Sequence, residues 1–189
     1  MSEPIQNNLL EAYRSYLWTL AHAQLGVQLR GQLDASDVVQ LTLLKAHAGF
    51  SELRNQSPPV LAAWLRKVLA TVLIDELRRC HRDKRDIDRE RSLAKDIDQS
   101  AAGMEQWLAA DQTSPSMAAE RNEQMLQLAS SLLKLPVDQR DVVIQKHLRN
   151  RTLQEIADET HRTVPAVAGL LRRGLATLRD IMDNVSDQH

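Results

Sequence analysis

The segment from Thr152 to Met182 constrains the fold most, because it encodes two helices joined by a very short turn. Thr152 and Glu155 form the Thr-x-x-Glu pattern of a capping box, which starts a helix. Thr163 can cap a second helix soon afterwards, and Pro165 fits its first turn. Two amphipathic helices joined so tightly predict a helix-turn-helix, with a plain helical hairpin as the alternative.

The rest of the chain is also predicted to be helical. Aromatic residues make up only 3% of the 189 residues, and Leu, Ala, Arg and Gln are frequent, which favours helices over strands. Apolar residues at helical spacing predict helices over residues 9–29, 34–48, 60–82, 117–135 and 136–148, and Val38, Leu41 and Leu44 form the predicted apolar stripe of the second of these helices. Residues 91–116 lack clear periodicity, and only a short helix around Met104, Trp107 and Leu108 is expected there. We therefore expect an all-α fold of two small helical domains, residues 1–90 and 119–184, joined by a flexible linker over residues 91–118.

The formal net charge of −1 hides a strong segregation of charge along the chain. Basic residues gather between Val60 and Arg85 and again between Arg140 and Arg179, whereas Ser92 to Gln139 is acidic. Two basic blocks separated by an acidic spacer suggest two contacts with one polyanion. The alternative is that these cations only solvate helix faces.

Several classes of protein do not fit the sequence. Cys80 is the single cysteine, so an internal disulfide is impossible, and the start of the chain lacks the pattern of a signal peptide. The apolar runs are too short to cross a bilayer, so we expect a cytoplasmic protein that does not enter membranes. The histidines have no metal-ligand spacing, and no phosphate loop or nucleophile motif is present. We expect no enzymatic activity, no metal and no cofactor.

Four segments, in this order, resemble conserved regions of the sigma-70 family of RNA polymerase sigma factors. Asp34–Gln40 with Lys45 resembles region 2.2, and Trp64–Arg79 resembles regions 2.3 and 2.4. Leu132–Arg140 resembles region 4.1, and Glu155–Arg179 resembles region 4.2. Their order and the short spacer are similar to the extracytoplasmic-function (ECF) group, which has only these two domains.

The resemblance implies a transcription initiation factor that carries core RNA polymerase to promoter DNA. The first domain would bind the polymerase clamp, recognise the −10 element and melt the DNA. The second domain would read the −35 element in duplex DNA and contact the flap region, and the linker would thread through the polymerase. An anti-sigma protein is a further partner that the resemblance allows.

The resemblance also assigns a polymerase-binding face to the helix that starts near Asp34. Its residues share one broad helix face that carries both polar and apolar groups. They are Asp34, Asp37, Val38, Gln40, Leu41 and Lys45. The alternative is that Asp34 and Asp37 only cap the helix.

The basic end of the helix over residues 60–82 is the candidate for −10 recognition and melting. Its cations can grip the phosphates of a separated strand while a pocket holds a flipped base. The candidate residues are Trp64, Arg66, Lys67, Thr71, Arg78, Arg79 and Arg82. Trp64 has core packing as its alternative role, and Thr71 stands where the family often has Asn.

The second helix of the helix-turn-helix would enter the major groove at the −35 element. The candidate residues are Arg162, Thr163, Val164, Ala166, Ala168, Arg172 and Arg173. The family commonly has polar residues at Ala168, Gly169 and Leu170, and Gly at His161. Thymine-methyl contacts, phosphate contacts and DNA shape are therefore expected to carry more of the recognition.

Two other functions also fit an all-helical chain with a helix-turn-helix. One is an ordinary DNA-binding regulator whose N-terminal half senses a signal or forms a dimer. The other is a helical protein that binds another regulator. The basic end of the helix over residues 60–82 argues against the first, because a sensor domain has no need of a second nucleic-acid patch.

Overall fold

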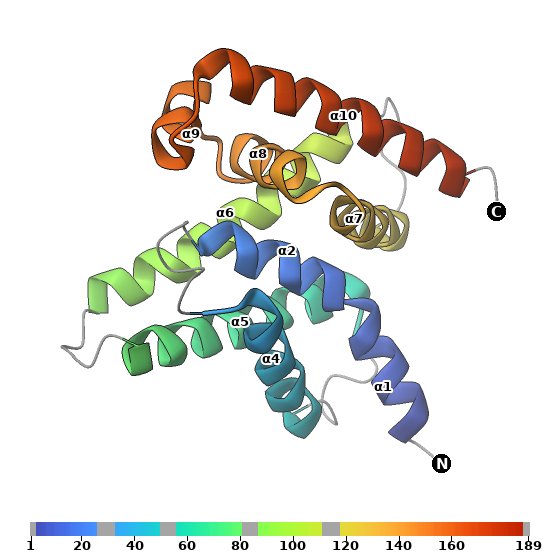
Figure 1. Cartoon of the computed structure of the whole chain (residues 1–189). Coiled ribbons are helices and arrows are strands. Elements are labelled where there is room, and N and C mark those ends of the chain that lie inside the picture. The colour runs from blue at the N-terminus through green and yellow to red at the C-terminus, as the bar shows by residue number, and fades with distance from the viewer. Residues whose placement is uncertain (1–2, 26–32, 50–55, 81–86, 111–117, 187–189) are drawn as a thin grey trace.

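The computed structural model describes residues 3–25, 33–49, 56–80, 87–110 and 118–186 of the chain. All regular structure in these ranges is α-helical, which confirms the predicted all-α class (Figure 1). The helices are α1 Glu3–Ala12, α2 Arg14–Gln24, α4 Ala35–Gly49, α5 Pro58–Cys80, α6 Ile87–Ala110, α7 Ala118–Leu133, α8 Val137–His147, α9 Leu153–Thr160 and α10 Val164–Ser186. None of the helices in these ranges is long and apolar enough to span a membrane.

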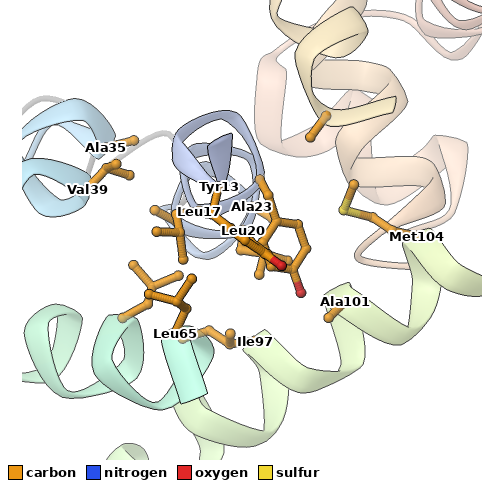
Figure 2. Packing of buried hydrophobic residues seen from close by; sticks show 14 of the residues in the cluster. Tyr13, Leu17, Leu20, Ala23, Ala35, Val39, Leu65, Ile97, Ala101 and Met104 are labelled. Carbon is orange, nitrogen blue, oxygen red and sulfur yellow. The ribbon is translucent and has the colours of Figure 1, made fainter. Parts of the chain in front are cut away.

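Helix α2 lies at the centre of the main hydrophobic core. Leu17 and Leu20 of α2 are fully buried, and Figure 2 shows them among side chains of α4, α5 and α6. The break between α1 and α2 falls at Tyr13, whose ring is buried and whose hydroxyl bonds to Asn122 of α7 at 3.2 Å. The core therefore joins the N-terminal helices to the first helix of the C-terminal half.

The prediction of a mostly irregular linker over residues 91–118 is wrong for residues 91–110, which belong to the 24-residue helix α6. Ile97, Ala101 and Met104 are buried in the main core at helical spacing, and Ser100 is buried beside them. Because Ala and Ser carry little apolar surface, the buried stripe of this helix is weak in the sequence. The expected domain boundaries at residues 90 and 118 stay a prediction.

The C-terminal helices α7 to α10 follow the predicted order closely. Leu128 and Leu132 of α7 are buried, as expected from their spacing, and α8 begins directly after Pro136. Helix α10 packs along α8 and α9, and Gly174 lets it approach α8. A smaller second core inside these helices gives α9 and the start of α10 a support of their own.

Candidate nucleic-acid interface

A capping box begins the helix-turn-helix, as the sequence predicts. The backbone N–H of Glu155 donates to the Thr152 hydroxyl at 3.2 Å, and the backbone N–H of Thr152 donates to the Glu155 carboxylate at 2.7 Å. The bonds from Thr152 hold the pKa of Glu155 below its ordinary value. The start of α9 is therefore fixed by local bonds that the sequence encodes.

His161 forms the turn between α9 and α10. Its backbone is left-handed, with φ of 54° and ψ of 39°, a conformation that glycine adopts more easily. The next residue, Arg162, donates its backbone N–H to the carbonyl of Ala157 at 2.9 Å. Thr163 then accepts a bond from the backbone N–H of Ala166 at 3.3 Å, which confirms it as a cap of α10. The turn needs a residue that tolerates positive φ, and here it is histidine.

The small core of the helix-turn-helix fixes which side of α10 is exposed. It consists of Val142, Ile156, Ala157, Val167 and Leu170, with Leu153, Val164 and Leu171 packed against it. Among the predicted contact residues, Val164 is therefore half-buried in the protein's own core, and Ala168 is half-buried as well. The other predicted contact residues of the helix-turn-helix are exposed: Arg162 and Thr163 just before α10, and Ala166, Arg172 and Arg173 within it.

The exposed side of α10 combines small side chains with cations. A Cβ at Gly169 would meet only the guanidinium of Arg173 at 3.4 Å, so Gly169 serves no close helix packing within the described residues. Arg173 folds back over Gly169 toward the start of the helix. Arg162 pairs with the exposed Asp138 of α8 at 3.0 Å. The exposed side of the helix-turn-helix therefore has an arginine at each end, Arg162 and Arg173, and small side chains between them.

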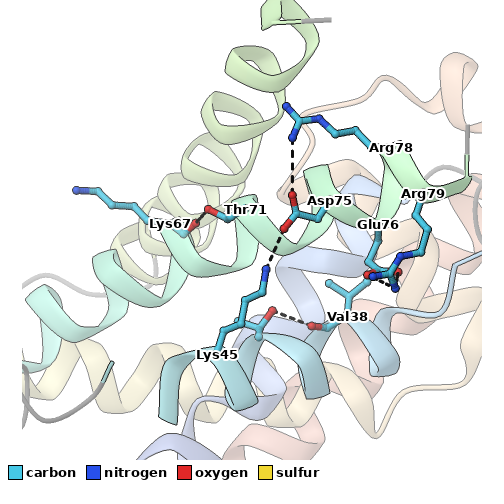
Figure 3. Close-up of polar contacts among 9 residues, drawn as sticks. Val38, Lys45, Lys67, Thr71, Asp75, Glu76, Arg78 and Arg79 are labelled. Atoms are coloured by element: carbon cyan, nitrogen blue, oxygen red, sulfur yellow. Dashed lines mark hydrogen bonds and ion pairs between the residues drawn. The ribbon is translucent and has the colours of Figure 1, made fainter. Parts of the chain in front are cut away.

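A second basic surface lies along α5 (Figure 3). Lys67, Thr71 and Arg78 are exposed on this helix, and the Thr71 hydroxyl donates to the Lys67 carbonyl at 3.0 Å. Asp75 lies among them and pairs with Lys45 of α4 at 2.9 Å and with Arg78 at 3.8 Å. We call Lys45, Lys67, Thr71 and Arg78 the α5 basic row. The structure brings these four predicted residues onto one face.

The remaining predicted residues of α5 lie elsewhere. Arg79 is exposed and pairs with Glu76 at 3.0 Å, beside the α5 basic row. Trp64 is half-buried against the main core, and its ring lies 3.3 Å from the position of a Cβ at Gly49, which favours the packing role. Arg82 lies outside the described residues.

Arg66 is held by the protein itself. Its Nε donates to Asp98 of α6 at 2.8 Å, and its guanidinium donates to the Tyr16 hydroxyl at 3.1 Å. Burial raises the pKa of Tyr16 to about 12, so the hydroxyl stays protonated. Burial lowers the pKa of Arg66, but Tyr16 and Asp98 outweigh it and the pKa is raised. Arg66 thus remains a cation, but it faces α6 rather than solvent.

The face of α4 differs from the predicted one in two residues. Val38 is fully buried, because this side of α4 packs on the main core, so the prediction that it lies on a docking face is wrong. Leu44, expected in an apolar stripe with Val38, is instead 69% exposed. Asp37 and Gln40 are exposed and Leu41 is half-buried, so with Leu44 they form a stripe at helical spacing. We call Asp37, Gln40, Leu41 and Leu44 the α4 stripe.

Asp34 acts at the start of α4. Its carboxylate accepts a bond from the backbone N–H of Ser36 at 2.8 Å, which supports the capping role. Sequence reasoning missed Leu44 as an exposed residue. The signal in the sequence was its spacing from Asp37 and Gln40, because residues three and four apart share a helix face.

A comparison with protein families matches the C-terminal helices. Residues 125–178 match the family model described as "Sigma-70, region 4". The matched range begins in α7, includes α8 and α9, and ends in α10, so it contains the whole helix-turn-helix core. These helices are therefore similar to region 4 of the sigma-70 family, a DNA-binding domain of transcription factors.

Proposed function

We propose that the chain is an RNA polymerase sigma factor of the ECF group, which binds core polymerase and directs initiation at specific promoters. The observation that carries the proposal is the sigma-70 region 4 match over residues 125–178, which coincides with an exposed, cation-bearing helix-turn-helix. In this role α10 enters the major groove with Arg172 and Arg173 on phosphates. The small Ala166 and Gly169 let the helix backbone approach the bases closely.

The N-terminal helices support the proposal through two separate surfaces. The α5 basic row offers cations to a strand of DNA, and the exposed side chains of Lys67 and Arg78 suit phosphate contacts. The α4 stripe offers an exposed leucine flanked by Asp37 and Gln40 to a protein partner. An exposed apolar centre with a polar rim is typical of protein interfaces.

The two surfaces adjoin each other through the Lys45–Asp75 pair. A partner on the α4 stripe would therefore hold DNA close to the α5 basic row. An ordinary regulator needs no such pairing of a protein-binding and a strand-binding surface. This arrangement favours core polymerase as the partner and −10 promoter DNA as the ligand.

The test compares binding with and without core polymerase. The purified chain should be retained by immobilised core enzyme, and it should bind promoter duplex tightly only as part of that complex. Tight and specific duplex binding by the chain alone, with no retention by core enzyme, would support an ordinary regulator instead. Both outcomes are measured with the whole chain, so the test needs no variant that lacks residues 1–90.

A further inference from the structure

Helix α6 contacts both halves of the molecule. It packs against α2 and α5 on one side and against α7 and α8 on the other. Its buried residues Ile97, Ala101 and Met104 belong to the main core, and Figure 2 shows them along α6 facing α2. The ring of Trp107 stacks on that of His147 in α8, with centroids 4.3 Å apart. Because this apolar surface is covered by both halves, α6 holds them together.

Two carboxylates of α6 each approach a cation in a different half. Asp98 accepts the 2.8 Å bond from Arg66 of α5. Asp96 lies 4.0 Å from the guanidinium of Arg149, just beyond α8. Arg66 belongs to the first basic block of the sequence and Arg149 to the second. The acidic spacer of the sequence, through Asp96 and Asp98, therefore contacts one arginine from each of the two basic blocks.

Helix α2 engages the C-terminal half in the same way. The guanidinium of Arg140 lies 4.6 Å from the centre of the Trp18 ring, and Arg149 also donates to the side chain of Gln24. His22 Nε2 lies 2.6 Å from Asp141 Oδ1. These contacts turn Arg140 and Arg149 toward the N-terminal helices, while α10 keeps its cations on the surface.

We propose that α6 is an intramolecular clasp, which holds the free chain closed and withholds Arg66 from DNA while it is docked on α5 and Arg149 while it is docked on α8. The inference rests on the proposed function only in taking DNA as the ligand. The chain exchanges between a closed and an open form. A ligand that binds only the open form has an apparent affinity that is reduced by the free energy of opening. Closure therefore weakens DNA binding by the free chain.

Gly103 allows the clasp to be opened without removing a side chain. A Cβ at this position would lie 2.9 Å from the backbone carbonyl oxygen of His147 and 3.3 Å from Cα of Leu148. Gly103→Ala therefore pushes α6 away from the end of α8, whose backbone cannot give way as a side chain can. Alanine is also a better helix former than glycine, so the substitution opposes docking while favouring the helix itself. Ala102→Leu is the matched control, because Ala102 is exposed on the same helix.

A second variant tests the charges rather than the packing. Asp96→Asn with Asp98→Asn removes both carboxylates and keeps the shape of the side chains. Asp98 is 68% exposed, so the double variant is expected to fold. Glu105→Gln is its control, because it removes one negative charge from an exposed position of α6.

The experiment measures the radius of gyration by small-angle scattering and the affinity for a random-sequence duplex without polymerase. Both test variants should be larger than the parent chain and bind duplex about fivefold or more tightly, within the usual range of coupling between sites. The slope of log affinity against log salt concentration should become steeper by about one for each cation that is released to contact DNA. The two controls should match the parent chain in both measurements.

An unchanged radius in both test variants, or a larger radius with unchanged duplex affinity, would overturn the clasp. If Gly103→Ala fails to fold, the carboxylate variant decides on its own. Retention on core polymerase is measured in parallel for the parent chain. If core polymerase does not retain the parent chain, the proposed function is overturned, but the scattering and duplex measurements still decide on the clasp. Failure of the proposed function and failure of the clasp are therefore distinguishable.

Discussion

Gly174 of α10 lies directly against Val143 of α8: a Cβ at Gly174 would come within 2.9 Å of Val143 Cγ2. The backbone carbonyl oxygen of Gln139 is 3.3 Å from the same point. Val143 is fully buried and its β-branched side chain has little freedom to move. The contact sets how closely the second helix of the helix-turn-helix can pack on its support.

Gly174→Ala should therefore destabilise the protein, although alanine favours helices. Overpacking costs about 1–3 kcal/mol, and the gain in helix propensity offsets about 1 kcal/mol of that. Gly169→Ala is the matched control, because its Cβ would meet only the end of Arg173. It should stabilise the chain by up to about 1 kcal/mol. Urea unfolding measures whether each variant gains or loses stability relative to the parent chain. Equal changes in the free energy of unfolding would contradict the packing described for α8 and α10.

His161→Gly should stabilise the protein by about 0.5–1 kcal/mol, because glycine adopts the left-handed turn without the steric cost borne by histidine. Asn150→Gly is the control. Asn150 also has positive φ, at 51°, but asparagine tolerates this conformation, so the change should be smaller. Thermal unfolding compares the two. A destabilised His161→Gly variant would show that the imidazole makes a contact worth more than the backbone strain.

Leu44→Gln should weaken retention by core polymerase by about tenfold or more, as expected for an apolar residue at the centre of an interface. Stability should change by less than about 0.5 kcal/mol, because the side chain is exposed. Leu9→Gln serves as control, since Leu9 is 40% exposed on α1, outside the α4 stripe. Normal retention of the Leu44 variant would exclude this stripe from the docking surface.

Arg172→Ala and Arg173→Ala should each weaken binding of the polymerase complex to upstream duplex DNA. The slope of log affinity against log salt should fall by about one for each lost phosphate contact, with little change in sequence preference. Arg179→Ala is the control, because Arg179 is exposed further along the same helix. A loss of preference at one base pair would instead assign that arginine to a base edge.

The parts of the fold that local chemistry dictates could be predicted from the sequence. The capping box of Thr152 and Glu155 and the Thr163 cap need only neighbouring residues, and the structure has both. Helix α6 could not be predicted in full, because its stripe includes Ala101 and the buried Ser100 and its surface is acidic. Its stability as a helix comes from contacts with distant segments rather than from its own pattern.

The exposed face of α4 was predicted wrongly, because tertiary packing decides which face of a helix is covered. Helix α4 has apolar residues on more than one side, so spacing alone assigned Val38 and Leu44 to the same stripe. In the structure the core covers Val38 and leaves Leu44 exposed. The contact that holds Arg66 could not be predicted for a similar reason, because its partner Asp98 lies 32 positions away in the sequence.

Promoter opening by the chain together with core polymerase is the most direct test of the proposed function. Run-off transcription on a promoter library would combine the purified chain with core enzyme, and permanganate would detect unpaired thymines. We expect transcripts and reactive thymines only when both proteins are present. The Arg78→Ala variant should keep duplex recruitment but lower the reactivity of the thymines. Specific duplex binding by the chain alone, with no transcript that depends on core enzyme, would contradict the proposed role as a sigma factor.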